Sequence, residues 1–387
     1  MTPRPFRILH VVGRMDRGGV ETWLMHVYRR LDRSRFDFDF LVHTDRAASY
    51  DAEIRERGGR LISLPSPTPG LGYARRLRGG IDTARPYDVV HSHVHHFSGV
   101  VLRAAQKAAI PVRIAHSHTD TSAVQATASV PRRAYLRLTE ALIDRHATVM
   151  LAASEQAGLS LFPPRRFPRN RWQLLHYGID LQPFATATDR DEVRAEFGLS
   201  EQQLVIGHVG NFHTAKNHEF LIEVFATVAR DDPQAALLLI GDGPLRARIE
   251  KMVATRGLAR RVVFAGARPD VARLLMGAVD IVVFPSLWEG LPMAVIEAQA
   301  AGLPVVLSDR ISREVDVIPQ LIERLHLEQS PDEWAAACRR FRGCSLRDSA
   351  HRIVADSDLD IRRSVSNLQR VYETAAADVQ AAGSRAA

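Results

Sequence analysis

Two glutamates, Glu289 and Glu297, stand in one apolar string that reads Phe-Pro-Ser-Leu-Trp-Glu-Gly-Leu-Pro-Met-Ala-Val-Ile-Glu. The string predicts a strand, a loop and then a helix that its second proline opens. Unpaired N–H groups at the start of that helix, near Gly290 and Leu291, would form an anion site that the helix dipole reinforces. One carboxylate can then bond sugar hydroxyls while the other bonds the ribose of a nucleotide. The alternative is a capped surface helix that carries two incidental glutamates.

A second candidate phosphate site lies near the N-terminus, where paired glycines follow the first predicted strand. Gly18 and Gly19 allow the backbone to approach a phosphate closely, ahead of a helix that starts near Glu21. The segment does not match the G-x-G-x-x-G dinucleotide fingerprint, which argues against a simple NAD-dependent enzyme. Taken alone, a Gly-Gly pair is also typical of an ordinary turn.

Two loops in the second half of the chain also follow predicted strands. In the segment Val209–His218, Lys216 can reach a diphosphate as a point charge, and the alternative is a solvated surface lysine. In the segment Leu239–Pro244, Gly241 and Gly243 mark a close approach to a ligand or, alternatively, a plain tight turn. Ligands of open α/β sheets bind beyond the carboxyl ends of the strands, so these loops are candidate parts of a binding site.

Histidines gather at the ends of two predicted strands, where alternate residues share one face of a sheet. No cysteine or carboxylate completes a tetrahedral ligand set there, so no metal is expected. His118, just past a strand end, is the best candidate to line the active site, and the alternative is a structural histidine. The two groups are His91, His93, His95 and His96, and His116 and His118.

The elements that must position these loops are short apolar runs that recur along the whole chain, with helix-length segments between them. Several runs lack polar alternation, as expected for parallel strands covered by helices on both faces. Strand and helix in alternation predict a doubly wound α/β protein. The runs are Phe6–Val12, Phe38–His43, Leu61–Leu64, Val89–Ser92, Val112–His116, Val149–Ala153, Val205–Val209, Ala236–Ile240, Val262–Ala265, Ile281–Phe284 and Val305–Leu307.

The chain has 387 residues, more than one hydrophobic core usually supports, so two domains are expected. The strand pattern pauses after Gly178, which predicts an N-terminal domain over residues 1–180 and a C-terminal domain over residues 181–360. Residues 361–387 predict an amphipathic helix, Ile361–Val379, that packs back on the N-terminal domain and ends in a flexible tail.

The composition, 46% hydrophobic and 25% charged residues, is ordinary for a globular protein. No apolar run approaches the roughly 20 residues of a membrane helix, and the N-terminus does not look like a signal peptide. Two cysteines cannot make a disulfide framework, so we expect a cytoplasmic protein. The net charge of +7 favours a partner that carries phosphate.

Basic residues cluster with aromatic ones, a mixture that suits the surface of an acidic bilayer. The alternative is a solvated surface that is simply rich in arginine. No zinc-finger or RNP motif supports binding to nucleic acid. The clusters are Arg75, Arg76 and Arg78; Arg132, Arg133 and Arg137; and Arg165, Arg166, Arg169 and Arg171, with Tyr73, Tyr135, Phe162, Phe167 and Trp172 among them.

Together these residues resemble the retaining glycosyltransferases of family four, which have the GT-B fold of two Rossmann-like doubly wound domains facing a central cleft. The likeness covers nearly the whole chain, with most of its specificity in the second half. The stretch Ser308–Asp316 resembles the bacterial capsule and exopolysaccharide branch in particular. The matching positions are the paired glutamates Glu289 and Glu297, the active-site histidine His118, the donor lysine Lys216, and the glycine loop of Gly18 and Gly19.

The resemblance implies transfer of a hexosyl group, with retention, from a nucleoside-diphosphate sugar to a glycan or a polyprenyl-diphosphate-linked acceptor in cell-surface polysaccharide biosynthesis. Glu289 and His118 would contact the sugar and Glu297 the ribose. Lys216 and the helix amides would stabilise the diphosphate, so neither a metal nor another cofactor is expected. The implied catalytic residues are His118, Glu289 and Lys216, and the implied donor-binding residues are Gly18, Gly19, Asn211, Lys216, Gly241, Gly243, Arg268, Glu289, Gly290, Leu291 and Glu297.

One departure from the family pattern is Asn211, which stands where the family usually has arginine. Arginine makes a bidentate charged contact with phosphate that asparagine cannot replace. His213 and Arg268 are nearby candidates to substitute for it. Two alternatives therefore stay open besides a transferase: a non-catalytic partner subunit that binds the donor, and a sugar-nucleotide epimerase on the same fold.

Overall fold

The computed structural model describes residues 4–65, 72–80, 86–347 and 349–386, and the chain divides into two compact units. The first unit consists of Met1–Gly178 together with Ile361–Ala387, and the second of Ile179–Asp360. The N-terminal part of the first unit therefore ends at Gly178, two residues before the boundary that the sequence predicts at residue 180. The C-terminal segment also belongs to the first unit.

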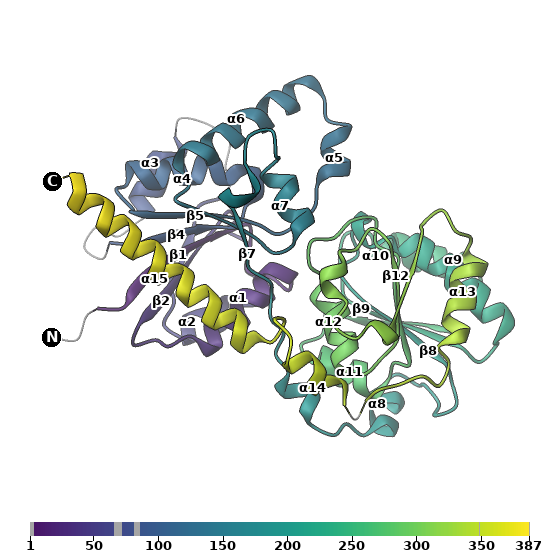
Figure 1. Ribbon diagram of the computed structural model, residues 1–387. Helices are drawn as coiled ribbons and strands as arrows, with labels where there is room; N and C mark the ends of the chain where they lie inside the picture. The colour runs from purple at the N-terminus through teal and green to yellow at the C-terminus, as the bar shows by residue number, and fades with distance from the viewer. Residues whose placement is uncertain (1–3, 66–71, 81–85, 348, 387) are drawn as a thin grey trace. The chain divides into compact units, whose positions relative to one another are not determined.

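The first unit is built on a seven-stranded, wholly parallel sheet in the order β3-β2-β1-β4-β5-β6-β7. Its strands are β1 (Phe6–Val12), β2 (Phe36–Val42), β3 (Leu61–Ser63), β4 (Val89–Ser92), β5 (Val112–Ser117), β6 (Val149–Ala152) and β7 (Gln173–Leu174). Its helices are α1 (Gly19–Arg30), α2 (Asp51–Glu56), α3 (Tyr73–Gly80), η1 (His95–Phe97), α4 (Ser98–Lys107), α5 (Ser122–Ala126), α6 (Val130–His146), α7 (Glu155–Leu161), η2 (Arg169–Arg171) and α15 (Ile361–Ala386). Helices α3, α4 and α6 cover one face of this sheet, and α1, α2 and α15 cover the other (Figure 1).

The second unit has a six-stranded parallel sheet in the order β10-β9-β8-β11-β12-β13. Its strands are β8 (Val205–Val209), β9 (Ala236–Ile240), β10 (Val262–Gly266), β11 (Ile281–Phe284), β12 (Val305–Ser308) and β13 (Ile322–Leu325). Its helices are η3 (Gln182–Ala185), α8 (Arg190–Glu196), η4 (Thr214–Lys216), α9 (His218–Asp231), α10 (Arg246–Thr255), α11 (Val271–Gly277), α12 (Met293–Ala300), η5 (Arg313–Val315), η6 (Pro319–Leu321), α13 (Pro331–Arg340) and α14 (Ala350–Ala355). The predicted fold class, two doubly wound α/β domains, is confirmed.

Two strands were not predicted from apolar runs, and each lies at the edge of its sheet. β7 has only two residues, and β13 carries Glu323 and Arg324 between its two apolar residues. An edge strand pairs on one side only and is less enclosed than a central strand, so its sequence need not be a continuous apolar run.

Helix α15 returns to the first unit and bonds to two of its elements. The Trp23 indole N–H donates to the Ser364 hydroxyl at 2.9 Å, and the Tyr372 hydroxyl lies 2.9 Å from Nδ1 of His91. Tyr372 is fully buried, between Phe36, Phe38 and that histidine. The helix continues to Ala386, beyond the Val379 end that the sequence predicts.

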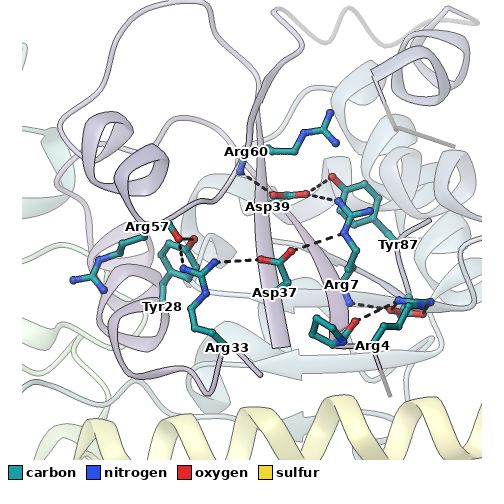
Figure 2. Close-up of polar contacts among 11 residues, drawn as sticks. Arg4, Arg7, Tyr28, Arg33, Asp37, Asp39, Arg57, Arg60 and Tyr87 are labelled. Atoms are coloured by element: carbon teal, nitrogen blue, oxygen red, sulfur yellow. Dashed lines mark hydrogen bonds and ion pairs between the residues drawn. The ribbon is translucent and has the colours of Figure 1, made fainter. Parts of the chain in front are cut away.

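A buried ion pair lies toward the amino end of the first sheet, away from the loops that carry the candidate site. Arg7 on β1 and Asp39 on β2 are 2.8 Å apart, and both are almost fully buried. The Tyr87 hydroxyl and the Arg60 backbone N–H donate to the same carboxylate at 2.7 and 2.8 Å (Figure 2). Each carboxylate oxygen is thus hydrogen-bonded, which a buried charge needs to be tolerated.

Candidate active site

The carboxyl edge of the second sheet brings Lys216 and Glu289 together, although 73 residues separate them in sequence. Lys216 ends η4 in the loop after β8, and Glu289 lies between β11 and α12. Since β8 and β11 are neighbours, their loops meet, and the N–H of Leu287 donates to the carbonyl of Ala215 at 2.8 Å. Lys216 Nζ lies 2.5 Å from Glu289 Oε1, and the two side chains are 20% and 12% exposed. Two of the three predicted catalytic residues therefore form one ion pair.

Glu297 lies on α12, in the helix that begins just after the Glu289 loop. Its carboxylate makes no hydrogen bond or ion pair with the described residues, and burial raises its pKa to about 7. The first N–H groups of α12 have no partner within the helix, and Pro292 offers no side-chain cap. Gly290 and Leu291 lie buried just ahead of that terminus. A polar ligand would thus meet both an unpaired carboxyl and helix N–H donors on one element.

Gly241 and Gly243 have a steric role that the sequence alone does not show. Both have positive φ, and a Cβ on Gly241 would lie 2.1 Å from the carbonyl oxygen of Gly210. A Cβ on Gly243 would lie 2.7 Å from the backbone nitrogen of Phe212. The loops after β8 and β9 are therefore packed backbone against backbone, with the Phe212 N–H donating to the Asp242 carbonyl at 3.0 Å. These glycines fix the position of the lysine loop, whether or not they also touch a ligand.

Of the two candidates to replace the missing arginine, His213 is exposed on the lysine loop and Arg268 is held by ion pairs. Asn211 is exposed on the lysine loop, next to Gly210. Arg268, in the loop after β10, pairs with Asp270 at 2.8 Å and with Glu196 at 2.9 Å. The bond to Asp270 chiefly raises the pKa of Arg268. Arg268 would have to leave two carboxylates to bind a diphosphate, so Lys216 is the stronger candidate.

His208 is a residue that sequence reasoning missed. It is fully buried on β8, and its Nδ1 lies 2.8 Å from the carbonyl oxygen of Val283. Because a carbonyl only accepts, Nδ1 carries the proton and Nε2 is a bare acceptor with no partner. A Cβ on Gly210 would lie 3.1 Å from that Nε2 and 3.2 Å from the Cδ and Cε atoms of Lys216. The imidazole and the lysine side chain therefore both pack against this glycine. The sequence feature that could have indicated His208 is its position two residues before Gly210, the glycine of a loop of the phosphate-binding type.

In the first unit, His118 follows β5 and belongs to a hydrogen-bonded chain of side chains. Nδ1 of His118 bonds to the Tyr177 hydroxyl, and Nε2 lies 2.8 Å from Nδ1 of His93. His93 Nε2 in turn lies 3.0 Å from Nδ1 of His10. Both ring nitrogens of the predicted catalytic histidine therefore have protein partners. His118 can bond a sugar only by exchanging one of them.

A second chain runs beside the first, from Tyr372 through His91 to His116. Nε2 of His91 lies 3.1 Å from Nδ1 of His116, and Nε2 of His116 is buried without a partner. Burial, together with the neighbouring rings, lowers the pKa of His91 well below 6.5, as it does for the other rings of the group. The five rings are therefore neutral at pH 7; they are His10, His91, His93, His116 and His118.

These rings form two triads whose nitrogens lie within 4.8 Å of one another, the spacing a metal ion would need. The triads are His10, His91 and His93, and His93, His116 and His118. His93 belongs to both triads, and its two nitrogens already bond to other rings. An ion would have to break these bonds, so absence of a metal stays our prediction.

The glycine loop of the first unit holds a carboxyl group at the place expected for a phosphate. Oε2 of Glu21 lies 2.3 Å from where a Cβ on Gly18 would stand, so only glycine leaves room for it. Burial, aided by nearby Asp16, raises the pKa of Glu21 to about 7. Ionised, Glu21 would repel a phosphate at Gly18 and Gly19. The loop is better suited to hydroxyl groups unless Glu21 moves or is protonated.

Comparisons with known proteins identify the fold and the family. A family profile of "Glycosyl transferases group 1" matches residues 189–354, and one of a "Glycosyl transferase 4-like domain" matches residues 18–178. Among solved structures, Anabaena HepE in complex with UDP and glucose has a TM-score of 0.79 at 18% identity, over 95% of this chain and 99% of that one. The fold and these matches define the class: a glycosyltransferase with the GT-B fold.

Two curated relatives place the chain more closely. The putative glycosyltransferase EpsF of Bacillus subtilis is 37% identical over 371 residues, which cover 95% of this chain and 96% of EpsF. An Escherichia coli UDP-Gal:alpha-D-GlcNAc-diphosphoundecaprenol alpha-1,3-galactosyltransferase is 26% identical over 80% of each chain. The protein belongs to the glycosyltransferase family that includes EpsF, and the predicted family and enzyme class are confirmed.

Proposed function

We propose that the protein transfers a hexosyl group from a nucleoside-diphosphate sugar with retention at the anomeric carbon. The observation that carries the proposal is the Lys216–Glu289 ion pair on the loop that leads into α12, the helix that carries the unpaired Glu297 carboxyl. These groups supply a cation, two carboxyls and helix N–H donors, which suit a diphosphate, a sugar and a ribose. HepE, which shares the fold, has been crystallised with UDP-glucose.

Each group has a distinct role in the proposed reaction. Lys216 and the N–H groups near Leu291 stabilise the charge that develops on the leaving diphosphate, as preorganised donors do. Glu289 accepts hydrogen bonds from the hydroxyls of the transferred sugar, and Glu297 from the ribose. His118 bonds the sugar by exchanging its Tyr177 partner, since that bond ends the histidine chain.

The proposed acceptor is a glycan or a polyprenyl-diphosphate-linked glycan of cell-surface polysaccharide biosynthesis. The E. coli relative is named for a diphosphoundecaprenol-linked acceptor, which supports this class. A hydroxyl-binding group is present in the first unit, where the Glu21 carboxyl lies against Gly18.

The test is a donor screen followed by product analysis. Thermal shift with UDP-, GDP- and dTDP-sugars should identify one stabilising donor, and NMR coupling constants should show that the product keeps the donor's anomeric configuration. Conversion of the donor without acceptor would favour the epimerase. Donor binding without transfer to any lipid-linked or soluble glycan would favour a non-catalytic subunit.

We further propose that α6 contacts an anionic membrane surface from the cytoplasmic side. Val130 and Leu138 on this helix are 70% and 59% exposed, and Arg132, Arg133 and Arg137 are exposed around them. Apolar side chains flanked by arginines are typical of a helix that lies in a bilayer interface. None of the described helices is long and apolar enough to cross a membrane. Of the other two predicted clusters, one is described in part, with Arg75 and Arg76 exposed on α3 and the Arg78 side chain outside the described residues. The members of the other, Arg165, Arg166, Arg169 and Arg171, form ion pairs with Glu140, Asp144 and Glu155.

Vesicle sedimentation tests the membrane proposal. Binding should require anionic lipid, weaken as salt shortens the Debye length, and fall when Arg132, Arg133 and Arg137 are changed to Glu. A control carries Arg260→Glu and Arg313→Glu, two exposed arginines of the second unit. Equal binding to neutral vesicles, or none to either kind, would contradict the proposal.

A further inference from the structure

A hollow of about 620 Å³, open to solvent, lies between α4 and α6 in the first unit. Both helices start near the carboxyl edge of the sheet and run back, so their C-terminal turns lie near the amino ends of β5 and β6. The hollow is therefore at the opposite end of the sheet from His118. It is lined by Arg103, Gln106, Leu142, Arg145 and His146.

The two arginines of the hollow have no acidic partner among the described residues. The acidic groups of α6 are engaged elsewhere, Glu140 with Arg165 and Asp144 with Arg166 and Arg171. Arg145 stands in the last turn of α6, where a cation also complements the helix dipole. That reason does not apply to Arg103, which lies in the middle of α4.

His146 forms the buried wall of the hollow and is held in place from two sides. Its Nδ1 lies 2.7 Å from Oε1 of Gln106, and its backbone carbonyl accepts from Nε of Arg113 at 2.7 Å. Burial lowers the pKa of His146, and Arg145, Arg103 and Arg113 add to the effect. A cationic field with no protein counter-charge, around a preformed hollow, is the arrangement that binds an anion.

The exposed face of α6 indicates where the anion comes from. At 3.6 residues per turn, Val130, Leu138, Leu142 and Arg145 share roughly one third of the helix circumference. The apolar stripe of Val130 and Leu138 therefore leads along about 20 Å of helix into the hollow. Apolar side chains that enter a bilayer interface would bring the hollow to the level of the lipid phosphates.

We propose that this hollow binds the phosphate of an anionic lipid headgroup, with Arg103 and Arg145 as its two cationic ligands. Two guanidinium groups can hold the non-bridging oxygens of one phosphate, which a carboxylate headgroup would not match in shape or charge. The inference rests on the proposed membrane contact of α6 but not on glycosyl transfer. Its role is to fix how the helix lies on the surface.

The experiment compares two kinds of vesicle with the same surface charge, one made with phosphatidic acid and the other with oleate. The full-length protein should bind phosphatidic acid vesicles about tenfold more tightly, and Arg103→Gln with Arg145→Gln should abolish that preference. Arg260→Gln with Arg313→Gln removes the same charge from the second unit and should keep it. Folding of each variant is checked by its circular dichroism and thermal unfolding.

Three outcomes would overturn the inference. Equal binding of the wild-type protein to both vesicles would show attraction to charge without a phosphate site. Preference retained in the double Gln variant would place the site elsewhere. If soluble glycerol 3-phosphate bound the hollow as tightly as the vesicles do, shown by the His146 imidazole NMR signals, the ligand would be a free phosphate ester. Absence of any vesicle binding would instead refute the membrane contact of α6.

Discussion

The carboxyl edges of the two sheets handle polarity in opposite ways. The first carries stacked, neutral imidazoles that satisfy one another through hydrogen bonds, with no ion pair among the five rings. The second carries the Lys216–Glu289 ion pair, and each edge also holds a carboxyl whose pKa burial raises, Glu21 in the first and Glu297 in the second. Charge developing on a diphosphate calls for fixed cations and dipoles, whereas a sugar or an acceptor calls for neutral hydrogen bonds and shape. In the proposed reaction, the two similar folds would thus serve different halves of the transfer.

Acid should have the largest effect, and it should act chiefly on the first unit. Burial lowers the pKa of the five histidines below 6.5, so the unfolded chain binds more protons and stability falls as pH drops below that value. From pH 7.5 to 5.5 the loss is up to about 1.4 kcal/mol for each ring that stays neutral. Hydrogen exchange should show β1, β4 and β5 opening more readily over this range.

The second unit provides the internal control for the acid experiment. Among its described residues, two buried histidines have a lowered pKa, His208 and His218, the latter at about 4. Its strands should therefore lose less protection between pH 7.5 and 5.5. Equal loss in both units would mean that the imidazole chains are not what makes the first unit sensitive to acid.

Removal of the cation should have the next largest effect. Lys216→Met should lower kcat by about 100- to 1,000-fold, since one preorganised contact to a developing charge is removed. Lys251→Met removes an exposed lysine of the same unit and should leave turnover unchanged. Steady-state kinetics with the identified donor checks both variants. If Lys216→Met kept full activity, the Lys216–Glu289 ion pair would not be part of the active site.

The two glutamates should separate turnover from affinity. Glu289→Ala should mainly lower kcat, and Glu297→Ala should mainly raise the dissociation constant of the donor. Each lost charged hydrogen bond is worth roughly 1.5–3 kcal/mol, or about 10- to 150-fold. Glutamine at each position is the isosteric control and should recover part of the loss. If both alanine variants kept normal kinetics and affinity, the assignment of the site would be wrong.

Asn211 offers a smaller, stabilising test of the same region. If this exposed position faces the donor diphosphate, Asn211→Arg should lower the donor dissociation constant by about tenfold, because charged hydrogen bonds exceed neutral ones. Asn211→Gln adds length without charge and should change little. Calorimetric titration with the donor measures both. No difference between the two variants would mean that the loop points away from the diphosphate.

The smallest expected effect is that of a chelator, which should be none. Lys216 and the N-terminus of α12 neutralise the diphosphate in the proposed reaction, so activity should survive EDTA. Activity that EDTA abolishes and Mn²⁺ restores would instead assign a metal to the histidine triads. The carboxyl edge of the first sheet would then carry the charge of a metal ion. The contrast between a neutral first edge and a charged second edge would be wrong.

The fold could be predicted because central parallel strands are continuous apolar runs, and ten of the eleven predicted runs start on the first residue of a strand or end on its last. Strand β13 was not predicted because its sequence, Ile-Glu-Arg-Leu, is not a continuous apolar run. Lys216 and Glu289 could be named because each follows a strand. Their contact follows from the adjacency of β8 and β11, which sequence spacing does not fix.

The histidine chains could not be predicted for a related reason. Histidines on every second residue share a face, but the chains also need β1, β4 and β5 to be neighbours with His10 opposite His91. The role of Gly18 could not be predicted for a different reason. Paired glycines leave room equally well for a bound phosphate and for a carboxyl side chain that points inward. Only side-chain placement shows that Glu21 fills that space.

The return of α15 to the first unit affects how the chain is made. During translation the strands of the first sheet are made before the second unit, but the partners of Trp23 and His91 on this helix are made after it. At roughly 5–20 residues per second, about ten to forty seconds separate Gly178 from the start of that helix. The second unit is continuous in sequence, and its residues are made during that interval. The first unit is therefore completed only after the second, and a ribosome that stops near Asp360 releases a whole second unit joined to a first unit without α15.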